Sequence, residues 1–423
     1  MSARAESRRG VMRRTVYLSL AAVAALGAGA RGARAADADL VARGEYLERA
    51  ADCEVCHTRP GGPPFAGGRA FVLPGIGTIY SPNITPDRET GIGTYSDAQF
   101  VSAVQRGVAP GWKHLYPVMP YPSYARMTVD DVRAIRAYLD TLRPVHAPAP
   151  ANEVRFPYSF RPVMIAWNLI NLPSAALADD PGQSADWNRG RYLVEAAGHC
   201  AECHSPRNIM QATSRAHSYA GTVTDGWRAY NISPDPDSGI GAWSDTQLAA
   251  YLSRGHAEGH GTAAGPMADV VSHSLRYLTA RDIAAMVTYL RTLPARRSDE
   301  TVANITPDAL ATGANSSNGS RLFAGACAGC HLTNGQGRQV EVADLWGARS
   351  LGETQGPNLT KLMVEGSRLD TAQGAMIMPA FGPEYRDQDL ADIANYAIGH
   401  FSHRIGHVTA RDVATARGDA PPS

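Results

Sequence analysis

The chain lacks the features that mark nucleic-acid-binding and membrane-spanning proteins. Its 423 residues include 40 basic and 40 acidic side chains, so there is no excess of positive charge to bind a phosphate backbone. No apolar stretch reaches the ~20 residues that a membrane-spanning helix needs. At 44% hydrophobic residues, however, the chain has enough apolar side chains to form packed cores.

The first 35 residues have the pattern of a secretory signal peptide. Five arginines from Arg4 to Arg14 precede an apolar stretch from Val16 to Ala28, and Ala33-Arg34-Ala35 offers small residues for cleavage. Residues 1–35 contain seven arginines and one glutamate, which leaves 33 basic and 39 acidic residues in the rest of the chain. We therefore expect export and an acidic mature protein that begins at Ala36. An uncleaved membrane anchor is the alternative.

Cysteine is scarce, and every cysteine belongs to a regular pattern. The six cysteines form three Cys-x-x-Cys-His motifs, which is the attachment signature of c-type haem. Two thiols on one helical turn can bond the two vinyl groups of a haem, and the histidine that follows can bind its iron. We expect three covalently bound haem c groups with three proximal iron ligands. The expected haem-binding cysteines are Cys53, Cys56, Cys200, Cys203, Cys327 and Cys330, and the expected ligands are His57, His204 and His331.

Other uses of six cysteines fit this pattern less well. Three disulfides would not require a histidine after each pair. A zinc site would bring two Cys-x-x-Cys units within ~15–20 residues of each other, whereas these motifs lie more than a hundred residues apart. A thioredoxin-like redox motif would occur once, on a βαβ unit.

The motifs lie in three similar segments, which predicts a mainly α fold with three tandem domains and one haem in each. Each segment opens with a short helical pattern and carries an Asn-apolar-hydroxyl triplet 26 or 27 residues after the motif histidine. Each ends in an amphipathic pattern typical of a helix that packs against the opening helix. The openings are Gly44-Glu45-Tyr46-Leu47, Gly190-Arg191-Tyr192-Leu193 and, more weakly, Ser320-Arg321-Leu322-Phe323; the triplets begin at Asn83, Asn231 and Asn358; the final helices are expected at Asp130 to Leu142, Ala280 to Leu293 and Asp387 to Phe401.

A distal iron ligand is expected between the motif and the final helix of each segment. Thioether sulfur is a soft ligand that raises the reduction potential of haem iron. Met119, Met267 and Met378 each have a proline beside them, which favours a rigid extended loop across a haem face. Met127 and Met376 are the rivals in the first and third segments. His114, His256 and His260 do not recur across the segments and are expected to be ordinary loop histidines.

The predicted boundaries follow from these patterns. We expect a signal peptide at 1–35, domains at 36–143, 186–294 and 319–408, linkers at 144–185 and 295–318, and a polar tail at 409–423. The first linker contains the apolar stretch Val163 to Ile170, which is too short to span a bilayer. It predicts a helix packed between the first two domains, with contact to a membrane surface as the alternative.

Several short sequence segments resemble those of a known family, the tri-haem cytochrome c subunits of bacterial membrane-associated dehydrogenases. These dehydrogenases oxidise alcohols, gluconate, fructose or aldehydes. The resemblance covers nearly the whole chain after the first 35 residues. It implies a periplasmic electron relay at the outer face of the cytoplasmic membrane, with a flavin, quinone or molybdenum dehydrogenase subunit as donor and ubiquinone or another respiratory acceptor. The segments that carry the resemblance are Ser81-Pro82-Asn83-Ile84-Thr85-Pro86-Asp87, Leu115-Tyr116-Pro117-Val118-Met119-Pro120-Tyr121, Trp187-Asn188-Arg189-Gly190, Cys203-His204-Ser205-Pro206-Arg207-Asn208 and Met378-Pro379-Ala380-Phe381.

We therefore expect an electron-transfer subunit that is not catalytic alone. The sequence shows no Gly-x-Gly-x-x-Gly motif after a strand for a dinucleotide, and three domains account for its length. The alternative is a self-sufficient haem enzyme, such as a peroxidase or a sulfur-compound oxidase. That chemistry needs an open iron position, whereas a methionine candidate is present for every expected haem.

Overall fold

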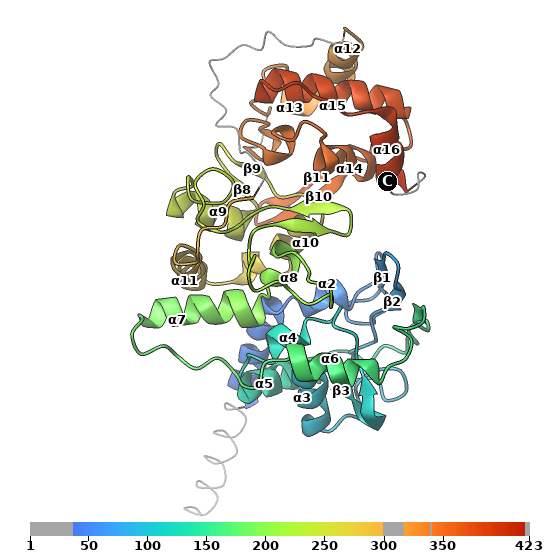
Figure 1. The fold of residues 1–423 in the computed structure, drawn as a ribbon, viewed down its shortest axis with the longest axis vertical. Coiled ribbons are helices and arrows are strands. Elements are labelled where there is room, and N and C mark those ends of the chain that lie inside the picture. The colour runs from blue at the N-terminus through green and yellow to red at the C-terminus, as the bar shows by residue number, and fades with distance from the viewer. Residues whose placement is uncertain (1–36, 299–316, 339–340, 419–423) are drawn as a thin grey trace, which may run out of the picture.

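The computed structural model describes residues 37–298, 317–338 and 341–418, which form three repeats stacked along the long axis of the molecule (Figure 1). The fold is mainly α, as predicted, and the described residues also form five small antiparallel sheets. The predicted signal peptide lies outside the described residues, as does most of the second linker. None of the described helices is long and apolar enough to cross a membrane.

The first repeat follows the predicted order from an opening helix, which includes residues 37–50, to a final helix. Ser96 caps the start of one helix: its hydroxyl accepts a hydrogen bond from the Gln99 backbone N–H, and the Gln99 side chain accepts one from the Ser96 N–H. The elements are α2 (Cys53–Cys56), β1 (Ala70–Leu73), β2 (Gly77–Tyr80), α3 (Asp97–Arg106), β3 (Val108–Ala109), β4 (Lys113–His114), α4 (Tyr121–Tyr124) and α5 (Val129–Leu139).

The second repeat copies this plan with one insertion. Gly44 lies nine residues before Cys53, whereas Gly190 lies ten residues before Cys200. A π-helical turn, η2 (Leu193–Ala197), accommodates the extra residue without ending the helix. The other elements are α7 (Ala185–Tyr192), α8 (Ala201–His204), β6 (Thr222–Thr224), β7 (Trp227–Ala229), α9 (Asp245–Arg254), β8 (His256–Ala257), β9 (Gly261–Thr262), α10 (Pro266–His273) and α11 (Ala280–Leu290).

The third repeat is more compact, and it has its own hydrophobic core. Residues 409–423, predicted to be a polar tail, contain a helix, α16, whose Val413 is fully buried in that core. The Arg417 side chain donates to the Asp387 carboxylate and to the Tyr385 carbonyl, so α16 is held against the repeat. The elements are α12 (Ser317–Ala326), α13 (Ala328–His331), η5 (Arg349–Leu351), α14 (Pro357–Glu365), β10 (Ser367–Thr371), β11 (Gly374–Met378), α15 (Asp387–Ser402) and α16 (Ala410–Arg417).

Each repeat depends on a glycine where its opening helix crosses its final helix. A Cβ atom on Gly44 or Gly190 would lie 1.9 Å from a backbone carbonyl oxygen of α5 or α11, and one on Gly319 would lie 2.3 Å from the Asp392 carbonyl oxygen in α15. The third repeat therefore matches the first two at Gly319, one residue before the Ser320 that the sequence pattern selected.

The first two repeats share a single core and exchange hydrogen bonds. The Tyr46 hydroxyl of the first opening helix donates to Asp282 of α11 at 2.5 Å. In return, the Tyr192 hydroxyl of the second opening helix donates to Asp131 of α5. These reciprocal bonds join the two repeats into one unit.

Residues 144–185, predicted to be a linker, add two elements to the first repeat. Strand β5 (Glu153–Val154) pairs with β2, and helix α6 (Val163–Asn171) lies against both of the first two repeats. Asn168 of α6 accepts a hydrogen bond from the Tyr121 hydroxyl at 2.8 Å, and the Trp167 indole donates to the Met210 carbonyl at 2.7 Å. The predicted helix thus bridges the repeats with one face.

The third repeat contacts the second through a different set of groups. The Asn358 side chain bonds both the backbone N–H and the carbonyl of Arg228 in β7, at 2.8 and 2.9 Å. Asn83 and Asn231 instead order the loops of their own repeats. The triplet of the third repeat therefore serves a different purpose, because Asn358 lies in α14 and makes the contact between repeats.

The glycine crossing gives a test with two positions in one helix. We expect Gly319→Ala to lower the free energy of unfolding by about 1–3 kcal/mol, because the added methyl group meets backbone that cannot move aside. A Cβ on Gly325, also in α12, would meet no atom within 4 Å, so Gly325→Ala should be neutral or stabilise the helix. Denaturation of the full-length variants followed by circular dichroism measures both, and equal effects would contradict the role of the crossing.

Candidate haem sites

The three Cys-x-x-Cys-His motifs adopt the same local structure. Each motif forms one helical turn, in α2, α8 or α13, with its histidine at or just beyond the end of the turn. The structure describes all six cysteines and joins none of them in a disulfide. Burial raises the pKa of the Cys200 thiol to about 12, and it raises the pKa of Cys56 to about 12 as well. Protonated, buried thiols do not suit a thiol–disulfide exchange site.

A backbone carbonyl holds each motif histidine in the same way. The Nδ1 atom lies 2.8 Å from the Pro82 oxygen in His57, 2.6 Å from the Tyr230 oxygen in His204, and 2.7 Å from the Ala343 oxygen in His331. Because a carbonyl can only accept, this contact places the proton on Nδ1 and leaves Nε2 free to bind a metal.

The protonation state of these histidines also suits a metal ligand. Burial lowers the pKa of His57, His204 and His331, which favours the neutral imidazole that binds iron. The third site is built from a shorter loop, since Ala343 follows His331 by 12 residues whereas Pro82 follows His57 by 25.

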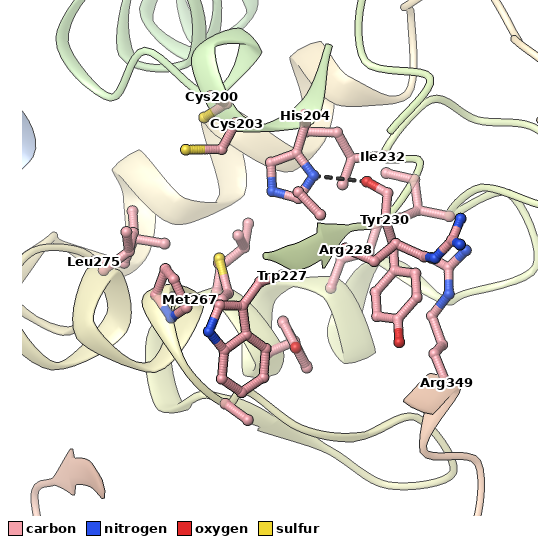
Figure 2. A pocket seen from close by; sticks show the side chains of 18 of the residues that line it. Cys200, Cys203, His204, Trp227, Arg228, Tyr230, Ile232, Met267, Leu275 and Arg349 are labelled. Carbon is pink, nitrogen blue, oxygen red and sulfur yellow. Dashed lines mark hydrogen bonds between the residues drawn. The ribbon is translucent and has the colours of Figure 1, made fainter. Parts of the chain in front are cut away.

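The second site is a cavity lined by groups from all three repeats. Figure 2 shows its lining residues from the second repeat together with Arg349 of the third. Cys200, Cys203 and His204 lie on it together with Met267, so the structure brings the predicted set of the second repeat to one place. The wall is mostly apolar, which suits the faces of a porphyrin. It includes Trp227, Ile232, Trp243, Leu248, Val270, Leu275, Met286 and Leu290.

The remaining methionine candidates lie in two different settings. Met119 is partly buried between two core clusters, whereas its rival Met127 is fully buried in the core of the first two repeats. In the third repeat, Met376 and Met378 share one face of β11, and Met378 packs against the core of that repeat.

The sequence analysis treats His260 as an ordinary loop histidine and does not single out Arg349, yet both residues line the second cavity. His260 lines it, and its ring stacks on Trp243 with centroids 3.8 Å apart. Burial and the nearby Arg349 lower the pKa of His260 to about 4, so it is neutral. Arg349 reaches the same cavity from the third repeat. Its approach depends on how the repeats pack, for which the sequence has no local signal.

Known proteins are similar to most of the length of this chain. The cytochrome c family model matches residues 188–294 and 316–397. The gluconate 2-dehydrogenase cytochrome c subunit of Pantoea cypripedii is 40% identical, with 90% of each chain covered. The fructose dehydrogenase cytochrome subunit of Gluconobacter japonicus is 39% identical, over 89% of this chain and 82% of that protein.

The alcohol dehydrogenase (quinone) cytochrome c subunit of Gluconobacter oxydans is 34% identical, over 93% of this chain and 85% of that protein. The chain belongs to this family of cytochrome c subunits. It is therefore an electron-transfer protein with covalently bound haem c, and the Cys-x-x-Cys-His turns are the structures in the chain that suit this attachment. The family assignment expected from the sequence is confirmed.

The second cavity gives a test of axial ligation. We expect Met267→Ala to open the distal iron position, because alanine has no sulfur to bind it. The oxidised full-length protein should lose about a third of its near-infrared methionine-to-iron charge-transfer band and gain a high-spin signal. Met210→Ala is the matched control, since Met210 packs near α6 and not on the cavity. An unchanged band would mean that Met267 is not the distal ligand, and His260 would be the next residue to test.

Proposed function

We propose that this chain is a tri-haem relay that accepts electrons from a partner dehydrogenase and passes them to a respiratory acceptor. Each repeat holds one haem. The thiols of Cys53, Cys56, Cys200, Cys203, Cys327 and Cys330 attach the haems; the proximal ligands are His57, His204 and His331, and the distal ligands are Met119, Met267 and Met378. The observation that supports this best is the repeated turn in which a carbonyl orients the motif histidine.

The residues of the chain prepare these sites for electron transfer. Haem iron, when bound, supplies one-electron oxidation and reduction. The thiols fix the position of each group, and the carbonyl contact fixes the plane and the tautomer of each proximal imidazole. The apolar wall of the second cavity excludes water, and Met267 lies where it can occupy the position that a substrate would need.

The arrangement of the repeats supports a linear path with the second site in the middle. Ala50 and Asp52, which lie three residues and one residue before Cys53, line the second cavity, so the first motif adjoins it. The wall also includes Ala348 and Ser350 of the third repeat. The second haem would therefore have a neighbour in each adjoining repeat.

The relatives support the identity of the donor. Their names describe cytochrome subunits of fructose, gluconate and alcohol dehydrogenases. We assign this chain a dehydrogenase subunit that oxidises an alcohol, a sugar, a sugar acid or an aldehyde, a periplasmic location and ubiquinone or another respiratory acceptor. The signal-like pattern of residues 1–35 supports the location.

Haem content and reduction test this role together. The purified full-length chain, made with cytochrome c maturation, should carry three haems in a pyridine haemochrome assay. It should stay oxidised with alcohols, aldehydes, sugars and sugar acids, and become reduced only when the partner dehydrogenase is added, because the chain holds no second catalytic cofactor motif. Two or fewer haems, or rapid stoichiometric reduction by substrate alone, would overturn the proposal.

The outer face of α6 supports attachment to the membrane surface, where ubiquinone is dissolved. Met164 and Trp167 point into the protein, whereas Ile165, Leu169 and Ile170 are exposed, Leu169 by 83%. Large apolar side chains beside α6 extend this surface. They are Phe156 and Phe160 before the helix, Val163 at its first position, and Ile209, which is fully exposed in the loop that Trp167 contacts.

The charges around α6 suit anionic phospholipids. Between Glu153 and Asp179 the charged residues are Arg155 and Arg161, and there is no acidic side chain. Arg161 donates to the carbonyl of His114, next to Lys113 and to Trp112, which is 85% exposed. Apolar side chains flanked by cations, in a chain that is acidic beyond residue 35, are typical of helices that lie in a bilayer interface.

A vesicle-binding assay tests this surface. The full-length protein should sediment with vesicles of phosphatidylcholine and phosphatidylglycerol, and less well as salt rises. The double change Ile165→Glu and Leu169→Glu should weaken this binding by roughly tenfold or more, since two apolar side chains no longer enter the interface. Val223→Glu and Ile377→Glu together are the control, because both residues are exposed elsewhere. If only binding to the dehydrogenase subunit is lost, the surface docks that protein instead.

A further inference from the structure

Arg349 of the third repeat reaches into the second haem site (Figure 2). Its guanidinium donates to the Ser238 carbonyl at 2.6 Å and to the Asn231 carbonyl at 3.3 Å. It also lies over the Tyr230 ring, with its central carbon 4.5 Å from the ring centroid. Tyr230 is the residue whose carbonyl holds the proximal His204. One side chain of the third repeat therefore contacts the loop that orients the iron ligand of the second.

Arg349 brings a positive charge to the wall of the cavity. Three side chains of Asp, Glu, Lys or Arg line it in the part of the chain that the structure describes, namely Asp52, Arg228 and Arg349. Arg228 lies 3.2 Å from the Glu353 carboxylate, which offsets its charge, and burial raises the pKa of Asp52 well above its ordinary value, which favours its neutral form. Arginine stays protonated in proteins. Repulsion from Arg349 contributes to the lowered pKa of His260.

We propose that Arg349 is a positioning residue through which the third repeat raises the reduction potential of the haem in the second repeat. Oxidised haem iron carries one more positive charge than reduced iron, so a fixed cation beside the site disfavours the oxidised form. The apolar wall lowers the local dielectric constant and strengthens this effect. The inference rests on the proposed function only in placing a haem on Cys200, Cys203 and His204.

Contact between the repeats does not depend on Arg349 alone. The Asn358 side chain makes two hydrogen bonds to the backbone of Arg228. The Asp370 N–H donates to the Ser272 hydroxyl at 2.9 Å, and the Thr262 hydroxyl donates to the Val342 carbonyl at 2.9 Å. Removing the charge at position 349 therefore leaves the third repeat attached, and the electrostatic effect can be measured separately.

A matched pair of variants separates charge from hydrogen bonding. Arg349→Gln keeps donors for the two carbonyls but loses the charge, whereas Arg349→Lys keeps the charge. Spectroscopic redox titration of the three-haem protein should show one of the three steps at lower potential in Arg349→Gln. The ratio of reduced to oxidised haem at a fixed potential should fall about tenfold at that step. Arg349→Lys should keep most of the original value.

Two further variants serve as controls. Arg386→Gln removes a cation that is 86% exposed, and Ser272→Ala removes a hydrogen bond between the repeats without changing any charge. Neither should move a step by a comparable amount. A shift in Ser272→Ala equal to that in Arg349→Gln would show that loosened contact is the cause, and it would overturn the proposal.

Identification of the affected haem completes the test. Met267→His should move the step of the second haem, and Arg349→Gln in that background should move the same step further. An effect on a different step, or no effect with three haems present, overturns the inference but leaves the relay intact. A count below three haems by pyridine haemochrome would instead show that the proposed function has failed.

Discussion

The close crossing of an opening and a final helix is the constraint on which each repeat depends. The backbones approach so closely that a methyl group on Gly44, Gly190 or Gly319 would collide with a carbonyl oxygen of the facing helix. In each repeat the Cys-x-x-Cys-His turn begins eight to ten residues after the glycine of the crossing. The second repeat keeps the same close crossing although its opening segment has one more residue than that of the first repeat. The extra residue is accommodated in a π-helical turn.

Besides the helix crossing, each candidate haem site needs only two more elements, the Cys-x-x-Cys-His turn and one loop carbonyl. The turn presents two thiols and an imidazole, and a loop carbonyl returns to hold Nδ1, from Pro82, Tyr230 or Ala343. The third loop is about half as long as the first two, and its orienting contact is nevertheless the same. A short loop can replace a long one because the contact needs only one backbone oxygen at the correct position.

Features that depend on residues close together in the sequence could be predicted well. The final helix that begins at Asp387 followed from apolar spacing within a few turns. The haem motifs were visible because their chemistry requires fixed local spacing. The part played by Asn358, the entry of Arg349 into the second cavity and the burial of Val413 depend on contacts between distant segments, and no local pattern carries that information.

The exchange of hydrogen bonds between Tyr46 and Tyr192 and the acids Asp282 and Asp131 has a geometric consequence. Each repeat gives the other the same group that it receives, so the pair has the character of an isologous dimer within one chain. Such an interface is closed: once two copies have met, neither has an equivalent surface left for a third. Asp389, at the matching position of α15, is bonded by Arg386 of its own repeat. A chain built in this way can extend beyond two repeats only through a heterologous contact, which the third repeat makes with the side of the second.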